Sequence, residues 1–213
     1  MHFYTNVQKY KDFILARGIK NGEKYVKRIK YEPTLYIPTN KHTAHKSVRG
    51  EFLQAKKFGS INHARNWRKK FKGTNVDIHG LDSWEYTYVN EVFPSDINFD
   101  IKQINILNID IECECENGFP EPVDAEEKVN AITMKLFGHD TIHVIGTDNF
   151  EFKTDNPNVK YYKCQHEKQL LKTFMEVWDE LEPDIITGWN VETFDIAYLV
   201  NRIWKLFNWD TVR

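Results

Sequence analysis

The chain has 213 residues, 41% hydrophobic and 28% charged, and its ten Gly and seven Pro are too few for a low-complexity or collagen-like segment. Its formal net charge of −2 conceals two halves of opposite sign. No run approaches the roughly 18 apolar residues of a membrane span, and residues 1–10 lack the layout of a signal peptide, which predicts an intracellular protein with no membrane partner.

The charges are distributed unevenly along the chain. Residues 1–80 hold 18 Lys and Arg against 5 Asp and Glu, whereas residues 81–213 hold 11 against 26. A basic half followed by an acidic half indicates an anionic partner for the first and cation binding for the second. Because the length suits one large domain or two modest ones, we expect two.

Short strands joined by turns, and then a helix, are predicted for the first part of the chain. Residues 13–16 and 25–29 flank Asn21-Gly22, which favours a hairpin because both residues tolerate positive φ. Ser60 is a candidate N-cap for a helix over residues 61–71, whose apolar face should pack on a small sheet. The basic residues of this helix project elsewhere and are expected to form a basic surface: Arg65, Arg68, Lys69 and Lys70.

A turn at residues 94–96 precedes a more regular arrangement, and we place the domain boundary near residue 100. Residues 1–100 are predicted to be a small basic domain of mixed β/α structure and residues 101–213 an α/β (α+β) domain. The second domain contains three β-rich runs joined by short connections, which suggest an antiparallel meander, and a further short strand: 104–111, 129–137, 141–145 and 159–162.

The remaining elements are two helices and one strand. Residues 166–181 have the periodicity of an amphipathic helix, 184–187 resemble a buried strand, and a last helix is predicted over about 193–207. The three cysteines are expected to be free thiols, because their spacing lacks the second Cys or His pair of a zinc finger: Cys113, Cys115 and Cys164.

Asp110-Ile111-Glu112 is the first candidate site. Side chains two apart in a strand point to the same face, so both carboxylates are expected on one face and Ile111 on the other. Two convergent carboxylates can hold a divalent cation, although an acidic, solvated strand end is the commoner origin of such a pattern. Carboxylates at the end of an apolar strand require compensation by a cation or by hydrogen bonds, which favours the functional interpretation.

The segment Gly188-Trp189-Asn190-Val191-Glu192-Thr193-Phe194-Asp195 is the second candidate site. Helix capping explains its residues one by one: Gly188 permits a sharp exit from the strand, Asn190 or Thr193 can cap the last helix, and Asp195 suits its first turn. Capping leaves unexplained why Trp, Asn and Asp gather at the carboxyl end of a strand, where open αβ sheets tend to place ligands.

With these two segments, the sequence resembles the proofreading exonuclease domain of family B DNA polymerases. Asp110-Ile111-Glu112 resembles the first exonuclease motif of that family, and Asn190 with Phe194-Asp195 resembles the second. Further segments resemble the T-even-type phage branch, so that the resemblance covers nearly the whole chain: Gly118-Phe119-Pro120-Glu121-Pro122, residues 187–192 and Asn201-Arg202-Ile203. The fold implied is ribonuclease-H-like.

The resemblance implies phosphodiester hydrolysis with two divalent cations, Mg²⁺ or Mn²⁺, about 4 Å apart. Asp110, Glu112 and Asp195 would be the catalytic residues and metal ligands. The substrate strand would contact Asn190, Phe119 and Phe194, with Phe119 packing on a terminal base or ribose; packing of its own turn is an equal alternative.

One departure from the family concerns its third exonuclease motif, Tyr-x-x-x-Asp, which is absent from this sequence. The sequence also contains no polymerase motif and ends shortly after Asn208-Trp209-Asp210. We therefore expect a fragment or one product of a divided polymerase gene, phage-encoded and located in the host cytoplasm. Its exonuclease domain and two-metal site would be incomplete, with weak or no nuclease activity.

The expected partners are a single-stranded DNA 3′ end, a template strand and the remainder of the polymerase, with a sliding clamp reached only through the missing part. The basic first domain, through Arg65, Arg68, Lys69 and Lys70, would bind DNA or RNA phosphates. The alternatives are a non-catalytic nucleic-acid-binding module and a scaffold subunit of a split polymerase. Charged residues on a solvated face more often have no ligand, and the same holds for scattered histidines such as His42, His45 and His63.

Overall fold

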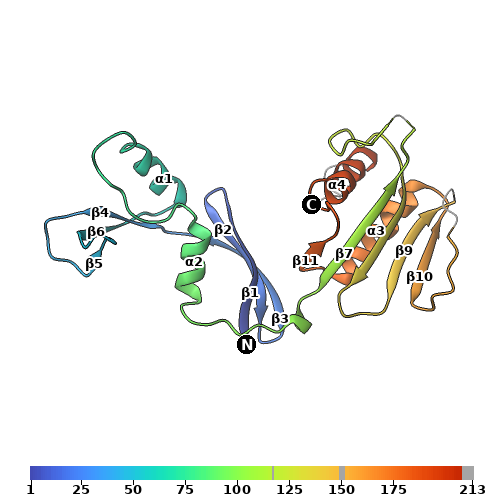
Figure 1. The fold of residues 1–213 in the computed structure, drawn as a ribbon, viewed down its shortest axis with the longest axis horizontal. Coiled ribbons are helices and arrows are strands. Elements are labelled where there is room, and N and C mark those ends of the chain that lie inside the picture. Colours follow the sequence, from blue (N-terminus) through green and yellow to red (C-terminus); the bar gives the residue numbers. More distant parts are fainter. Residues whose placement is uncertain (117, 149–151, 208–213) are drawn as a thin grey trace. The chain divides into compact units, whose positions relative to one another are not determined.

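The computed structural model describes residues 1–116, 118–148 and 152–207, which form two compact units, Met1–Asp100 and Ile101–Arg213 (Figure 1). Asn208-Trp209-Asp210 lies outside the described residues. No helix in the described ranges is both long enough and apolar enough to span a membrane.

Two small antiparallel sheets form the first unit. The first has the order β1-β2-β3, from β1 (His2–Tyr10), β2 (Phe13–Lys20) and β3 (Glu23–Lys30). The second has the order β4-β6-β5, from β4 (Thr34–Pro38), β5 (His45–Lys46) and β6 (Phe52–Lys57). Asn21 and Gly22 have φ of 56° and 86°, so the predicted hairpin between β2 and β3 is confirmed.

Helix α1 (Ile61–Lys69) confirms the predicted helix and its cap, because the Ser60 side chain accepts a hydrogen bond from the backbone N–H of His63 at 3.2 Å. Its apolar face enters a core with residues of both sheets: Ile14, Tyr31, Leu35, Phe58, Ile61, Ala64 and Trp84. Helix α2 (Trp84–Val92) was not predicted, because its aromatic and β-branched residues have weak helix propensity. Burial of Trp84 in the core fixes this helix.

The second unit is built on one five-stranded sheet with the order β10-β9-β8-β7-β11 (Figure 1). A short 3-10 turn, η1 (Ile101–Gln103), leads into β7 (Ile106–Cys113), which pairs antiparallel with β8 (Val129–Leu136), and β8 pairs antiparallel with β9 (Ile142–Thr147). The predicted meander is therefore confirmed. The strand β10 (Val159–Cys164) runs parallel to β9, and β11 (Ile185–Thr187) runs parallel to β7.

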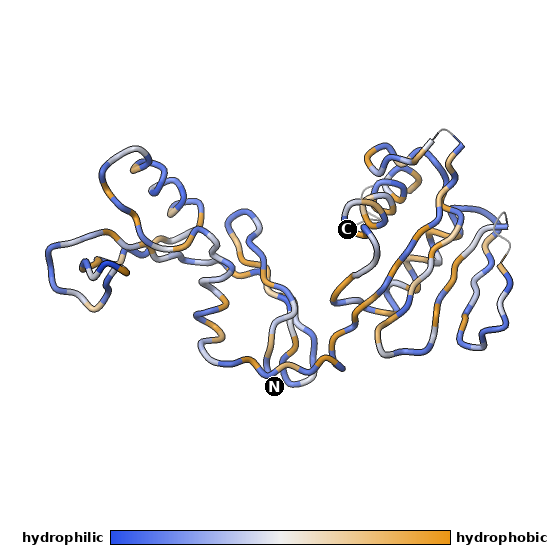
Figure 2. Tube along the Cα trace, in the orientation of Figure 1, coloured by the Kyte–Doolittle hydropathy of each residue, from blue (hydrophilic) through white to orange (hydrophobic). Residues whose placement is uncertain are grey.

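The core of the second unit lies between this sheet and helices α3 (Glu167–Leu181) and α4 (Asp195–Leu206). Apolar and polar residues alternate along β7, as the colours of Figure 2 show, and Leu107, Ile109 and Ile111 are buried. The buried face of α3 follows the predicted helical period: Leu170, Leu171, Phe174, Val177 and Leu181. The mixed α/β class predicted for the chain is confirmed.

Two predictions about the last elements are wrong. Strand β11 is exposed rather than buried, because it lies at the edge of the sheet and pairs only with β7; Ile185 and Ile186 are 39% and 37% exposed. Helix α4 begins at Asp195 after a turn, and its N-cap Phe194 makes no side-chain capping bond, so neither Asn190 nor Thr193 caps it.

Candidate functional site

The two carboxylates of β7 lie on the exposed face of the strand. Asp110 and Glu112 are exposed, while the intervening Ile111 is 7% exposed, as the strand alternation predicts. The pairing of β7 with β8 shifts register between Glu112 and Cys113. Such a bulge redirects the side chains beside it, and bulges are frequent near functional sites.

Asp195 lies beside this strand although it is 84 positions away in sequence from Ile111. Its Oδ1 accepts a hydrogen bond from the backbone N–H of Ile111 at 3.1 Å, and the residue is only 3% exposed. Burial raises the pKa of the Asp195 carboxyl, and the negative charge of Asp110 raises it further, while the bonded backbone N–H groups act in the opposite direction. Asp110 and Asp195 therefore share one electrostatic environment.

The loop before α4 requires glycine where it leaves β11. A Cβ atom on Gly188 would lie 2.5 Å from the carbonyl oxygen of Ile109, so only glycine permits this approach to β7. Asn190 has a left-handed φ of 56°. Its side-chain oxygen accepts a hydrogen bond from the Thr193 hydroxyl, and its carbonyl oxygen accepts from the N–H of Phe194 at 2.9 Å. The exposed Asn190 is thus held by its own turn.

Phe119 and Phe194 meet across the site, with ring centroids 5.2 Å apart at an angle of 42°. Phe119 remains 77% exposed despite this contact. Because aromatic faces accept any base without reading sequence, an exposed ring of this kind suits contact with a nucleotide. Its packing on Phe194 equally suits a structural role, so the substrate contact remains a prediction.

A buried ion pair, which sequence reasoning missed, supports the loop of residues 120–128. The guanidinium of Arg202 binds both carboxylate oxygens of Glu167, at 2.7 and 2.8 Å, and donates to the carbonyl oxygens of Ala125 and Glu126. The Tyr198 hydroxyl donates to the carbonyl of Glu127 at 2.7 Å. The sequence signals were the resemblance of Asn201-Arg202-Ile203 to the phage branch and the position of Arg202 on the apolar face of α4, seven residues after Asp195.

The three predicted metal ligands consist of carboxylates, which are the donors that Mg²⁺ and Mn²⁺ prefer. In the described parts of the chain, however, no three His, Cys, Asp or Glu side chains are grouped closely enough to hold a metal ion. The structure thus relates Asp110 and Asp195 electrostatically without assembling a full ligand set.

The cysteines are free, as expected. Burial, reinforced by the charges of Glu167, Asp195 and Glu112, raises the pKa of the Cys113 thiol to about 12. Cys113 is therefore a protonated, unreactive thiol beside the candidate site at neutral pH.

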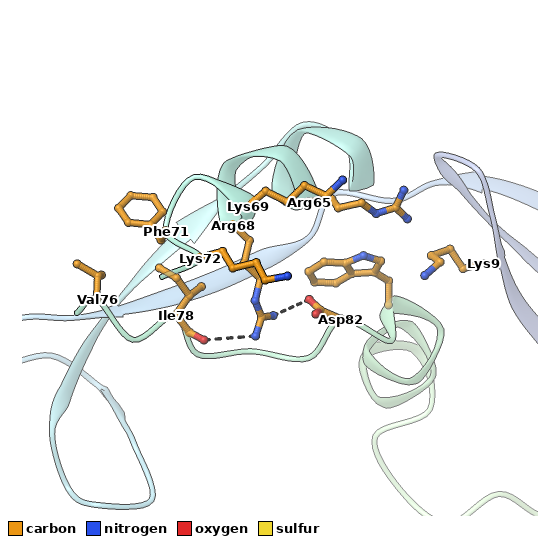
Figure 3. Close-up of a pocket in the computed structure, with 10 residues that line it drawn as sticks. Lys9, Arg65, Arg68, Lys69, Phe71, Lys72, Val76, Ile78 and Asp82 are labelled. Carbon is orange, nitrogen blue, oxygen red and sulfur yellow. Dashed lines mark hydrogen bonds and ion pairs between the residues drawn. The ribbon is translucent and has the colours of Figure 1, made fainter. Parts of the chain in front are cut away.

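In the first unit, three of the four predicted nucleic-acid-binding residues of α1 line a cavity of about 480 Å³ (Figure 3). These are Arg65, Arg68 and Lys69, whereas Lys70 is not among the lining residues. Arg68 is engaged within the protein, since its Nη1 lies 2.5 Å from Asp82 Oδ1 and 3.1 Å from the carbonyl oxygen of Gly80. The exposed rings of His42, His45 and His63 pack against neighbouring aromatic residues.

Comparison with known proteins relates the chain to DNA polymerases. The family model described as DNA polymerase family B, exonuclease domain, matches residues 56–212. The DNA-directed DNA polymerase of Escherichia phage RB69 is 28% identical, with 99% of this chain and 26% of that protein covered. The DNA-directed DNA polymerase of Enterobacteria phage T4 is 25% identical, with 94% and 25% covered. The chain thus spans about a quarter of the length of these relatives.

Proposed function

Because the chain belongs to the family of family B DNA polymerase exonuclease domains, we propose that it is part of a phage-type replicative DNA polymerase and contributes to 3′ to 5′ proofreading. The exonuclease domain of this family has a ribonuclease-H-like fold, so the fold predicted from sequence is confirmed. Nucleotide addition would belong to the remainder of a longer polymerase, working on DNA inside the host cell.

The observation that carries the proposal is the meeting of the two sequence motifs. The hydrogen bond between the Ile111 N–H and Asp195 Oδ1 joins the centre of the first motif to the last residue of the second. A structural explanation of each motif alone, as a solvated strand end and a helix cap, gives no reason for this meeting. Asp195 is also buried, although a helix cap could remain in water at lower cost.

Exonuclease domains of this family are generally dependent on divalent metal ions. We propose that Asp110, Glu112 and Asp195 bind Mg²⁺ or Mn²⁺, because these ions prefer carboxylate oxygens and the Asp195 carboxyl is buried beside Asp110. Bound cations would activate water and stabilise the leaving 3′ oxygen. A further carboxylate would come from the third motif of the family, outside this sequence.

The chain itself would hold the end of a single DNA strand. Asn190, fixed in its turn, would donate its side-chain amide to the strand near the terminal phosphate. Phe119 would pack on the last base or ribose, with Phe194 supporting its ring at 5.2 Å. A contact of this kind is sequence-tolerant, as removal of any misinserted nucleotide requires.

Mn²⁺ binding tests the assignment directly, because activity requires a ligand from outside this sequence. Titration followed by electron paramagnetic resonance should show Mn²⁺ bound by the protein, with affinity reduced at least tenfold in Asp110→Asn and in Asp195→Asn. Asp140→Asn, a change of equal charge in the turn between β8 and β9, should leave binding unchanged. If all three substitutions reduced Mn²⁺ affinity equally, the proposed metal site would be wrong, and the nuclease assignment with it.

Trimming of a 3′-labelled single-stranded DNA, with the same variants, is the matching activity assay. We expect weak Mn²⁺-dependent trimming at most by this chain alone, and trimming that disappears in Asp110→Asn when the chain is part of a full-length polymerase. Robust trimming by Asp110→Asn would assign the cleavage to another site.

A non-catalytic nucleic-acid-binding module is the second candidate, and the basic half of the chain favours it. In that case a labelled single strand should bind with strong salt dependence, and replacing Arg65, Lys69 and Lys70 with Gln should weaken binding uniformly across sequences. Strand binding with no Mn²⁺ binding would favour this module over the nuclease.

A further inference from the structure

The cavity in the first unit is lined by three separate segments of the chain (Figure 3). Lys9 comes from β1, Arg65, Arg68 and Lys69 come from α1, and the segment that follows α1 contributes the remaining lining: Phe71, Lys72, Val76, Ile78, Asp82 and Trp84. Its volume of about 480 Å³ falls within the range of small-molecule sites, which is roughly 300–1,000 Å³. Five of its ten lining residues are basic and one is acidic.

The acidic residue does not neutralise the cavity, because Asp82 is paired with Arg68. Arg68 is further fixed by the carbonyl oxygens of Gly80 and Ile78, and Figure 3 draws its bonds to Asp82 and Ile78. The residues that remain, Lys9, Arg65, Lys69 and Lys72, form no ion pair with any residue in the described ranges. Four cationic side chains are thus available to one ligand.

The distribution of these cations suits a compact anion better than an extended strand. Arg65 and Lys69 lie one turn apart on α1, Lys72 follows the helix, and Lys9 of β1 adds a cation from a distant segment to the same hollow. Lys70, the residue that follows α1, is exposed and does not line the cavity. Of the two aromatic lining residues, Phe71 is half-buried and offers apolar surface on which part of a ring could pack, whereas Trp84 is buried in the core.

We propose that this cavity binds a compact polyphosphate, and that its ligand is a nucleoside triphosphate. Lys9, Arg65, Lys69 and Lys72 contact the phosphate oxygens with charge-assisted hydrogen bonds, and Arg68 forms a fixed wall. Phe71 contacts the nucleoside. The site is separate from the carboxylates of the second unit, and its occupation requires neither the metal nor the nuclease activity proposed for them.

Isothermal titration calorimetry of the 213-residue chain with ATP, in the presence of EDTA, tests this inference. EDTA removes divalent cations, so metal-mediated binding at Asp110 and Asp195 does not contribute. The pocket variant Lys9→Gln, Lys69→Gln, Lys72→Gln should bind ATP at least tenfold more weakly than the parent chain. The control variant Lys20→Gln, Lys30→Gln, Lys41→Gln loses the same charge at exposed positions outside the cavity, and its affinity should change less than threefold.

The ligand series identifies which part of the ligand is recognised. Binding should weaken from ATP to AMP, and pyrophosphate should compete with ATP more weakly than ADP does, since it lacks the nucleoside. Pyrophosphate that binds as tightly as ATP would overturn the nucleoside contact. Equal losses in the two triple variants, or no ATP binding by the parent chain, would overturn the site. A ten-nucleotide strand that displaces ATP and depends more strongly on Lys9, Lys69 and Lys72 would show that the cavity belongs to a strand-binding surface.

Discussion

Replacing Arg202 with Met is expected to cause a large loss of stability in the second unit. The guanidinium of Arg202 makes two hydrogen bonds to Glu167 and two to the carbonyl oxygens of Ala125 and Glu126, all between 2.7 and 2.8 Å. The side chains of Arg202 and Glu167 are 8% and 9% exposed. Methionine fills much of the same volume but satisfies none of these acceptors.

The magnitude follows from what remains after the substitution. Glu167 would be left as a buried carboxylate that still accepts a hydrogen bond from the N–H of Val129, and breaking a buried pair in this way costs about 3–5 kcal/mol. A domain is usually stable by about 5–15 kcal/mol, so this loss is a large part of the total. The loop of residues 120–128 would also lose two of its hydrogen bonds to α4.

Urea unfolding provides the assay, with amide hydrogen exchange of β7 and β8 assigning the transition to the second unit. Lys205→Met is the matched control on the same helix, since its pair with Glu126 is exposed and should contribute no more than about 1 kcal/mol. Adding Glu167→Gln to Arg202→Met should recover part of the loss, because the unpaired charge is removed. Equal losses for Arg202→Met and Lys205→Met would refute the reasoning.

Two further predictions concern the loop and the sheet. Gly188→Ala should destabilise the second unit by about 1–3 kcal/mol and weaken Mn²⁺ binding, because its Cβ would lie 2.5 Å from the Ile109 carbonyl oxygen; Gly59→Ala, with open space around it, should be neutral by the same urea assay. Burial lowers the pKa of His143 below the usual histidine value of about 6.5, so the unfolded chain takes up a proton first and stability should fall as the pH drops through that value towards the folded pKa. Between these two pKa values, His143→Asn should make the urea midpoint depend less on pH. An unchanged slope would show that other groups cause the pH dependence.

The elements predicted well are those whose signals are local. The alternation along β7, the Asn21-Gly22 turn and the Ser60 cap each depend on residues that are close in sequence, and all three are confirmed. Helix α2, in contrast, depends on residues that are distant in sequence. Its own residues favour strand as much as helix, and its position is decided by Trp84 entering a core formed by distant strands.

The exposure of β11 could not be predicted from its composition. A short run such as Ile185-Ile186-Thr187 has the same sequence whether it lies in the middle of a sheet or at the edge. Only the strand order places it beside β7, with no further strand of the described residues on its other side. The lining of the basic cavity also depends on residues that are distant in sequence. Lys9 is more than fifty positions from α1, so the sequence identified the charges of the helix but not the hollow they share.

The candidate site combines both kinds of information. Each motif gave its own carboxylates, but their meeting depends on α3 and β11, which return the chain to β7 in parallel register, with Ile185 opposite Ile106. Gly188 then allows the loop to approach the Ile109 carbonyl. The hydrogen bond from Arg202 to the sequence-distant Glu167 holds α4 in place. Arg202, which lies outside both exonuclease motifs, therefore helps to fix the position of Asp195. For this reason Arg202→Met should weaken Mn²⁺ binding as well as stability, whereas Lys205→Met should change neither.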